Sequence, residues 1–160
     1  MLYGQNETNR CVPLCMSGTY GDKDTRICHD VCFFGRRAGP NNTPKYTWAD
    51  DATNFCTERC TRNTFADNAT VRCVTDCTLG NFADNSTWRC VAICPVNPLS
   101  FAYQPTKKCI YECPAPLFGN EDGRICSTFC PITPFYYYRD YERKRCVKSN
   151  ICLYCRLYLP

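Results

Sequence analysis

Cysteine is the residue type with the most evident chemistry in this sequence, since 17 of its 160 residues are cysteines. Most of them form pairs in which three residues separate the two cysteines. The pairs are Cys11/Cys15, Cys28/Cys32, Cys56/Cys60, Cys73/Cys77, Cys90/Cys94, Cys109/Cys113 and Cys126/Cys130, followed by a longer pair, Cys146/Cys152. Cysteine at this density and in regular spacing predicts a disulfide framework, which forms in an oxidising compartment.

Zinc binding and nucleophilic catalysis are two other uses of cysteine, and both fit this spacing poorly. Structural zinc sites favour cysteine pairs with two intervening residues, supplemented by histidine. The only such pair here is Cys152/Cys155, and the only histidine is His29. A Cys–His nucleophile would need a reduced cysteine beside that histidine. We therefore expect no metal site and no catalytic cysteine.

The charged residues do not indicate an enzyme or a nucleic-acid-binding protein either. Aspartates recur along the chain, but no stretch has the dense alternating acids of a calcium-binding loop, so we interpret them as turn caps. A basic cluster contains Arg139, Arg143, Lys144 and Arg145. Nucleic-acid binding would predict a more basic chain than one with a net charge of +4. The cluster is interpreted as a solvated or packing surface, with a glycan or protein contact as the alternative.

The scaffold that carries the cysteines is a repeat, most visible in Phe65–Cys77 (FADNATVRCVTDC) and Phe82–Cys94 (FADNSTWRCVAIC). An aromatic residue stands eight positions before the first cysteine of each pair after Cys11. These aromatics are Tyr20, Trp48, Phe65, Phe82, Phe101, Phe118 and Tyr138. A Gly or Ala follows each of them except the last, which Arg139 follows; Asp or Asn usually comes next, and Thr often stands three before the cysteine.

This pattern predicts a short β-hairpin in which the aromatic covers a disulfide and the Asp caps the turn. The expected fold is a small disulfide-rich protein, an elongated rod of tandem β-hairpin repeats with a period of about 17 residues and little or no helix. Residues 1–10 are expected to be a polar lead-in, 11–152 the repeats and 153–160 a tail. An insert rich in Gly, Pro and Asn, residues 33–47, is expected to be a loop. No apolar run is long enough for a membrane-spanning helix.

The run of Cys-Val-x-x-Cys, an aromatic, a small residue and Asp resembles the single-disulfide modules of growth-factor-receptor (furin-like) cysteine-rich regions. It is also similar to tandem cysteine-rich repeats in surface proteins of protists. The resemblance implies that the second cysteine of one pair bonds the first cysteine of the next. The implied links are Cys15–Cys28, Cys32–Cys56, Cys60–Cys73, Cys77–Cys90, Cys94–Cys109, Cys113–Cys126 and Cys130–Cys146. The uniform period favours the same links, because joining first to first cysteines would double it.

Cys11, Cys152 and Cys155 remain after these links, and an odd cysteine indicates an intermolecular bond or a missing upstream segment. We expect copies of the chain to join head to tail, because the tail is apolar and neither end resembles a cap. The candidate interface residues are Cys11, Cys152, Cys155, Tyr136, Tyr137, Tyr154, Leu157 and Tyr158. The alternative is a fragment whose neighbouring repeats continue within one longer chain.

Four Asn-x-Ser/Thr sequons begin at Asn6, Asn41, Asn68 and Asn85, where a secreted chain can carry N-linked glycans. No cofactor and no nucleic-acid partner is expected. The sequence favours an extracellular or cell-surface glycoprotein with a structural role in a coat or fibre. A ligand-binding or adhesion ectodomain fragment of a receptor-like surface protein is the alternative, and no residue constellation supports an enzyme.

Overall fold

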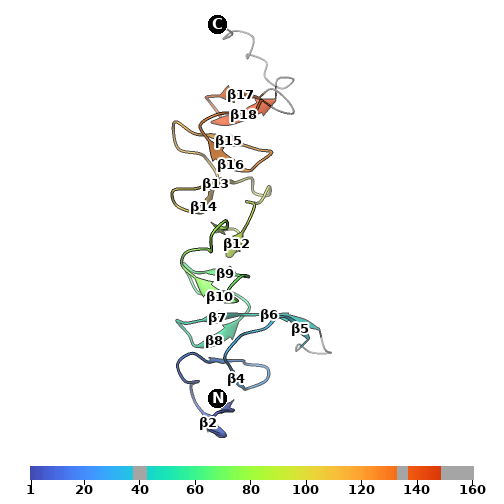
Figure 1. The fold of residues 1–160 in the computed structure, drawn as a ribbon, viewed down its shortest axis with the longest axis vertical. Helices are drawn as coiled ribbons and strands as arrows, with labels where there is room; N and C mark the ends of the chain where they lie inside the picture. Colours follow the sequence, from blue (N-terminus) through green and yellow to red (C-terminus); the bar gives the residue numbers. More distant parts are fainter. Residues whose placement is uncertain (38–42, 133–136, 149–160) are drawn as a thin grey trace. The chain divides into compact units, whose positions relative to one another are not determined.

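The computed structural model describes residues 1–37, 43–132 and 137–148, and in these ranges the regular secondary structure is β-strand without helix (Figure 1). None of the described residues therefore forms a helix that could cross a membrane. The strands are β1 (Tyr3–Gln5), β2 (Arg10–Val12), β3 (Tyr20–Gly21), β4 (Cys28–His29), β5 (Phe34–Arg37), β6 (Pro44–Tyr46), β7 (Trp48–Asp50), β8 (Phe55–Thr57), β9 (Phe65–Asp67), β10 (Arg72–Val74), β11 (Phe82–Asp84), β12 (Arg89–Val91), β13 (Phe101–Tyr103), β14 (Lys108–Ile110), β15 (Phe118–Asn120), β16 (Ile125–Ser127), β17 (Tyr137–Asp140) and β18 (Arg145–Lys148). The prediction of a small disulfide-rich protein built from tandem short hairpins is confirmed.

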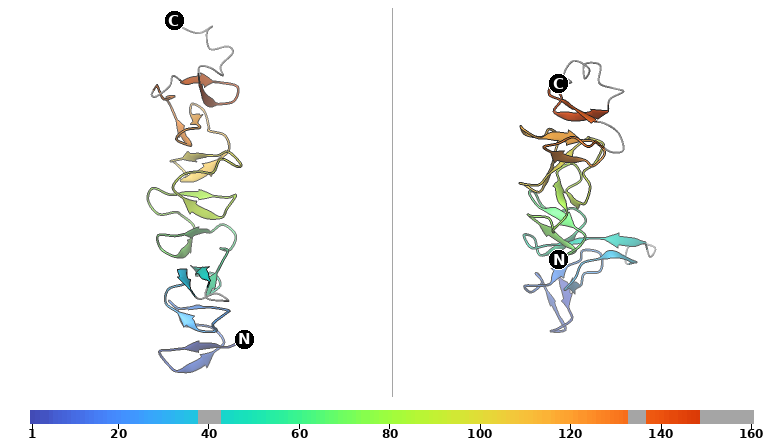
Figure 2. Two further views of the ribbon diagram at one scale, coloured as in Figure 1. Left: turned by 90° about the vertical axis from the view of Figure 1, so that its right-hand side faces the viewer. Right: turned by 45° about the horizontal axis from the view of Figure 1, so that its top comes forward.

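The strands belong to two compact units, which we describe separately. Unit 1 contains Met1–Leu79 and Thr87–Cys90, and its sheet has the strand order β12-β9-β10-β7-β8-β3-β4, beside the pairs β1–β2 and β5–β6. Unit 2 contains Gly80–Ser86 and Val91–Pro160, with the order β17-β18-β15-β16-β13-β14-β11. Within each unit, Figure 2 shows successive hairpins lying one above another.

Each hairpin is antiparallel and is closed by the turn that the sequence predicts. In β9–β10, Phe65 pairs with Val74 and Ala66 with Cys73. The carboxylate of Asp67 accepts hydrogen bonds from the Ala69 amide (3.2 Å) and from the Thr70 hydroxyl (3.0 Å). Such side-chain caps replace backbone hydrogen bonds that the tight turn cannot make.

The turns share one feature that the sequence does not reveal. In every hairpin of the repeat, the residue two positions before the first cysteine has a positive φ, between 49° and 58°: Asn9, Arg26, Asn54, Val71, Trp88, Lys107, Arg124 and Lys144. This left-handed conformation favours Gly and Asn and is costly for a β-branched residue such as valine. The turn geometry therefore overrides residue preference at this position.

Neighbouring hairpins are joined by the same backbone hydrogen bond each time. The amide of the small residue in one hairpin donates to the carbonyl of the positive-φ residue in the next hairpin, at 2.8 to 3.0 Å. The pairs are Gly4–Arg26, Gly21–Asn54, Ala49–Val71, Ala66–Trp88, Ala83–Lys107, Ala102–Arg124 and Gly119–Lys144. The second strand of each hairpin thus lies parallel to the first strand of the hairpin before it, as Arg89 opposite Ala66 illustrates.

The apolar side chains form small clusters along each unit. In unit 1, Trp48 packs with Ala66 and with the disulfide cysteines Cys60 and Cys73 of the following hairpin. In unit 2, Phe82 packs in the same way with Ala102, Cys94 and Cys109. The aromatic of one hairpin therefore covers the disulfide of the next, which is how so short a repeat buries apolar surface.

Three segments differ from the expectations. Residues 1–10, expected as a lead-in, contain β1, which pairs with β2 to form a further hairpin with Tyr3 and Gly4 in the aromatic and small positions. The insert, expected as a loop, contains the paired strands β5 and β6, in which Phe34 and Tyr46 pack edge to face at 5.4 Å. In the last hairpin, Tyr137 rather than Tyr138 packs on Phe118 and Cys146. The insert and the shifted tyrosine are local departures from the 17-residue period. Tyr3 and Gly4 keep that period, 17 residues before Tyr20 and Gly21, so the sequence does contain a signal for the first hairpin.

Candidate functional sites

The cysteines form the disulfides Cys15–Cys28, Cys32–Cys56, Cys60–Cys73, Cys77–Cys90, Cys94–Cys109, Cys113–Cys126 and Cys130–Cys146. These are the links implied by the resemblance. Their Cα–Cα distances, 5.4 to 5.7 Å, lie in the usual range for disulfides. Cys11 is free and exposed on β2, whereas Cys152 and Cys155 lie outside the described residues.

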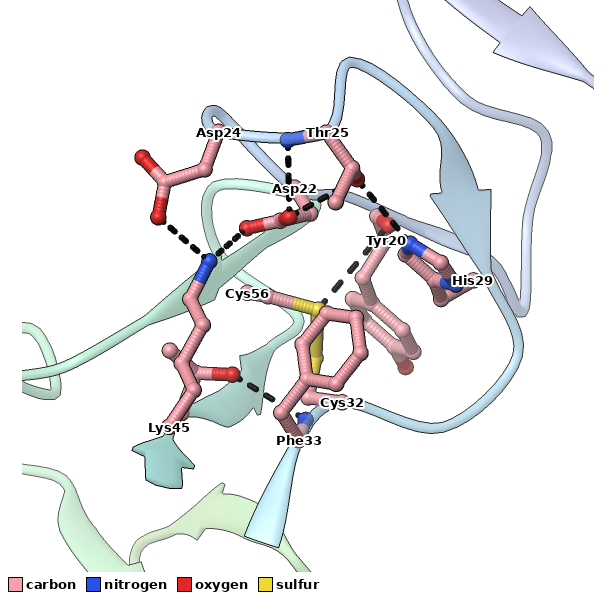
Figure 3. A network of polar contacts seen from close by, with 10 residues as sticks. Tyr20, Asp22, Asp24, Thr25, His29, Cys32, Phe33, Lys45 and Cys56 are labelled. Atoms are coloured by element: carbon pink, nitrogen blue, oxygen red, sulfur yellow. Dashed lines mark hydrogen bonds and ion pairs between the residues drawn. A yellow bond between two sulfur atoms is a disulfide. The ribbon is translucent and has the colours of Figure 1, made fainter. Parts of the chain in front are cut away.

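The most elaborate polar network joins the insert to the hairpin β3–β4 (Figure 3). Lys45 on β6 is only 7% exposed. Its ammonium group donates to Asp22 and, at 2.7 Å, to Asp24, and it lies 5.3 Å from the centre of the Phe33 ring. The amide of Thr47 also donates to the carbonyl of Phe33. The Lys45 contacts hold the insert against the hairpin, and the Thr47–Phe33 bond joins the two ends of the insert.

The two buried charges stabilise each other's ionised form. Burial alone would raise the pKa of the Asp22 carboxyl, but hydrogen bonds from Lys45 and Thr25 outweigh burial and hold the pKa below its ordinary value. Burial alone would lower the pKa of Lys45, but its hydrogen bonds to Asp22 and Asp24 raise that pKa instead. Both groups are therefore charged at neutral pH, and the network is an ion pair that supports structure.

The single histidine belongs to this network as well. His29 Nε2 lies 3.2 Å from the Thr25 hydroxyl, and its ring packs edge to face on Phe33 at 4.9 Å. The neighbouring Cys28 is bonded to Cys15. The Cys28 sulfur beside His29 is therefore committed to a disulfide, and the contacts of His29 with Thr25 and Phe33 are packing contacts.

A second polar group lies on the outside of unit 1. The Tyr20 hydroxyl donates to Asp51, and Arg72 donates to both Tyr20 and Asp51. Burial and the bond to Asp51 raise the pKa of Tyr20, while the bonds from Tyr20 and Arg72 lower the pKa of Asp51. Arg72 also lies over the Tyr20 ring at 5.4 Å. All three residues are already engaged with one another, so this group supports packing between hairpins.

Beside this group is an open hollow of about 530 Å³ in unit 1. It is lined by Asp50, Asp51, Ala52, Thr64, Cys73, Val74, Thr75 and Asp76. Asp50 Oδ2 is buried and, within the described part of the chain, has no hydrogen-bond partner. No group of three or more His, Cys, Asp or Glu side chains among the described residues is arranged to hold a metal ion.

Three of the four sequons occupy the same place in their hairpins. Asn6, Asn68 and Asn85 each stand five residues before the first cysteine, at an exposed turn. The sequon threonine of Asn68 is Thr70, whose hydroxyl donates to Asp67 as part of the turn cap. Asn41 lies outside the described residues. The turn tips are therefore accessible for modification at three sequons.

The remaining candidate residues form ion pairs, pack inside unit 2 or lie outside the described residues. In the basic cluster, Lys144 pairs with Glu112 at 3.2 Å and Arg145 with Glu121 at 3.5 Å. Tyr137, a candidate interface residue, is 7% exposed, so its ring packs inside unit 2 instead of offering a surface. The candidates Tyr136, Tyr154, Leu157 and Tyr158 lie outside the described residues.

Comparison with protein families, with curated proteins and with solved structures finds no match to this chain.

Proposed function

We propose that the chain is an extracellular structural glycoprotein: a disulfide-stapled array of β-hairpins that serves as a scaffold in a surface coat or fibre and has no catalytic activity of its own. The observation that carries the proposal is the repeated joint between hairpins. Every joint has one disulfide and one backbone hydrogen bond, and at the joints that follow Tyr20, Trp48 and Phe82 the aromatic residue also packs on the disulfide cysteines. A disulfide that closes a loop of about 14 residues contributes about 3 kcal/mol, so such a chain depends on an oxidising environment for its stability.

N-linked glycans at Asn6, Asn68 and Asn85 belong to this proposal, and Asn41 is included from its sequence alone. The exposed turn tips support it, because a glycan there would project away from the disulfides. Treatment of the secreted chain with a peptide N-glycosidase should lower its mass. An unchanged mass would reject the glycans and leave the scaffold role standing.

Immunogold electron microscopy tests the structural role directly. An antibody raised against the chain should label an extracellular coat or fibre on the cells that make it. Labelling confined to the cell interior would overturn the proposal.

The second candidate is a ligand-binding or adhesion ectodomain, and the hollow beside Asp50 favours it. Label scattered over the plasma membrane as isolated molecules, without a coat or fibre, would support this candidate. Head-to-tail joining of identical copies stays a prediction.

A further inference from the structure

The hairpin repeat buries an aspartate at the same turn position four times. Asp22, Asp50, Asp67 and Asp84 each stand six residues before the first cysteine of a pair, and each is at most 3% exposed. A buried carboxylate oxygen without a hydrogen-bond partner is costly in free energy. The partners of the two oxygens therefore show whether each turn is complete within the fold.

Two of these turns supply both oxygens from within the hairpin. Asp67 Oδ1 accepts a hydrogen bond from the Ala69 amide (3.2 Å), and its Oδ2 accepts one from the Thr70 hydroxyl (3.0 Å). The hydroxyl of Ser86 lies within hydrogen-bond distance of both oxygens of Asp84, at 2.9 and 2.8 Å. These aspartates are satisfied as turn caps.

The third turn uses a cation from outside its hairpin. Thr25 donates to Asp22 Oδ2 through its amide and its hydroxyl, and Asp22 Oδ1 accepts a hydrogen bond from the ammonium group of Lys45. Figure 3 shows this ammonium group between the carboxylates of Asp22 and Asp24. The turn can thus bind a primary ammonium group at the oxygen that its own cap leaves open.

The fourth turn has the open oxygen but not the cation. Asp50 Oδ1 accepts a hydrogen bond from the Ala52 amide at 3.0 Å. Asp50 Oδ2 is buried and has no partner within the part of the chain that the structure describes. Departures of this kind from full hydrogen bonding are typical of functional sites.

The side chain with the open oxygen borders the hollow of about 530 Å³ described above. The wall of the hollow also includes the exposed residues Asp51 and Asp76, which add negative charge. Ala52 and Val74 contribute apolar surface to the same wall. Acidic oxygens beside apolar groups suit a cation that is carried on an alkyl stem.

An ammonium group fits this site better than a metal ion or a guanidinium group. Ca²⁺ takes about six to eight oxygen ligands, whereas no group of three or more His, Cys, Asp or Glu side chains in the described ranges is arranged to hold a metal ion. A guanidinium group binds best to two carboxylate oxygens at once, and Asp50 has only Oδ2 without a partner. An ammonium group is a compact charge that needs only one oxygen.

We propose that the hollow bordered by Asp50 is a binding site for an alkylammonium group. The ammonium group donates to Asp50 Oδ2, as Lys45 donates to Asp22, and the alkyl stem lies against Ala52 and Val74. A free polyamine and a lysine side chain of another protein both supply this chemistry. The inference goes beyond the proposed structural role and does not depend on it.

Amide chemical shifts of the ¹⁵N-labelled full chain, with its disulfides formed, test the site. Titration with n-butylammonium chloride should shift the Ala52 amide saturably, with a dissociation constant on the order of 1 mM. The Ala69 amide is the internal control, because it makes the equivalent bond to Asp67 and should not move. Neutral n-butanol and sodium chloride, at matched concentrations, should leave the Ala52 amide in place.

Two further probes distinguish the two sources of the ligand. One is spermidine, and the other is the blocked peptide acetyl-Gly-Lys-Gly-amide. We expect spermidine to bind more tightly, because Asp51 and Asp76 can attract its additional ammonium groups. Tighter binding of the peptide would instead identify a lysine side chain as the ligand.

Substitution of the buried aspartate locates the binding. Asp50→Asn should weaken n-butylammonium binding about tenfold or more, because the hydrogen bond loses its charged acceptor. Glu58→Gln removes the same charge from an exposed position in unit 1 and should leave the affinity unchanged. Disulfide mapping and circular dichroism establish that each variant is folded. If Asp50→Asn misfolds, Asp76→Asn takes its place and should weaken spermidine binding about threefold.

Several results would overturn the inference. They are the absence of a saturable shift at Ala52, an equal shift at Ala69 and an unchanged affinity in the folded Asp50→Asn chain. Displacement of n-butylammonium by Ca²⁺ at a lower concentration would overturn it as well, because the hollow would then be a metal site. None of these results changes the immunogold pattern, so the proposed function would stand or fail separately.

Discussion

The turns of β3–β4 and β7–β8 bury the same residue in the same position but compensate its charge differently. Asp22 and Asp50 each stand six residues before the first cysteine, and they are 1% and 2% exposed. Both carboxylate oxygens of Asp22 have partners, Lys45 on one and Thr25 on the other. Asp50 Oδ1 accepts a bond from the Ala52 amide at 3.0 Å, while its Oδ2 has no partner among the described residues.

The difference shows that the repeat buries the carboxylate and that other segments decide whether its charge is compensated. Both aspartates are placed by the same turn, so their burial follows from the hairpin. The compensating cation, Lys45, comes from the insert and contacts the Asp22 turn. Because a buried, unpaired polar atom is costly, the Asp22 turn should gain stability from its network and the Asp50 turn should not.

The largest expected effect is that of Lys45→Ala. This change leaves the Asp22 carboxylate buried without its cation, which should lower the free energy of unfolding of the insert and its hairpin by about 3 kcal/mol. Hydrogen–deuterium exchange at the Thr47 amide, which bonds Phe33 across the insert, measures the loss. Lys23→Ala is the matched control, since Lys23 is exposed in the same turn and should leave exchange nearly unchanged.

Asparagine substitution compares the two turns directly. Asp22→Asn removes the charge that Lys45 contacts and should cost about 2 kcal/mol, the range for a hydrogen bond to a charged group. Asp50→Asn keeps the oxygen that Ala52 needs and removes only an uncompensated charge, so stability should stay the same or rise by about 1 kcal/mol. Guanidinium denaturation, monitored by the fluorescence of the buried Trp48, measures the free energy of unfolding of both variants. Equal losses in the two variants would contradict the comparison.

The sequence predicted the residue types that repeat, and it missed most of the contacts that occur once. The cysteine spacing, the aromatic eight positions before the first cysteine of a pair and the aspartate cap all recur, so one hairpin explains the others. The ion pair between Lys45 and Asp22 could not be predicted from the sequence, because the two residues are 23 positions apart and no motif links them. Arg139 visibly breaks the repeat in the sequence, but its contact with the Phe118 ring, at 5.4 Å, depends on the fold.

Local conformation was the other limit on prediction. The positive-φ position is occupied by residue types as different as Arg26, Val71 and Trp88, so residue preference could not identify it. The hairpin register and the hydrogen bond to the neighbouring hairpin impose this conformation from outside the turn. A structure was needed to see that the turn carries a strained residue in every repeat.

Acid should weaken the Asp22 turn, with a smaller effect than the Asp22→Asn variant. The pKa of Asp22 lies below its ordinary value of 3.8, so its carboxylate contributes stability above that pH. This stability is lost as the pH falls through the lowered pKa, when the protonated group no longer pairs with Lys45. Exchange at the Thr47 amide should therefore rise faster between pH 5 and about pH 3 in the parent chain than in Asp22→Asn, after correction for intrinsic exchange rates. Parallel profiles would contradict this assignment.

The smallest expected effect concerns the positive-φ residue four positions after each aspartate. The two turns differ in the residue type at this position. The β3–β4 turn has Arg26 at φ 56° and the β7–β8 turn has Asn54 at φ 58°. Asparagine tolerates this conformation better than arginine, and the exposed Arg26 side chain makes no described contact that the change would remove. Arg26→Asn should therefore raise the free energy of unfolding by about 0.5 kcal/mol, a fraction of the cost of the left-handed conformation. The reciprocal Asn54→Arg should lower the free energy of unfolding by a similar amount.

Hydrogen–deuterium exchange at the Gly4 amide measures the effect of Arg26→Asn. The carbonyl of residue 26 still accepts its bond from Gly4 in the variant, so slower exchange at that amide would accompany the gain in stability. If Arg26→Asn lowered stability instead, the arginine side chain would contribute something that the strain at this turn does not explain.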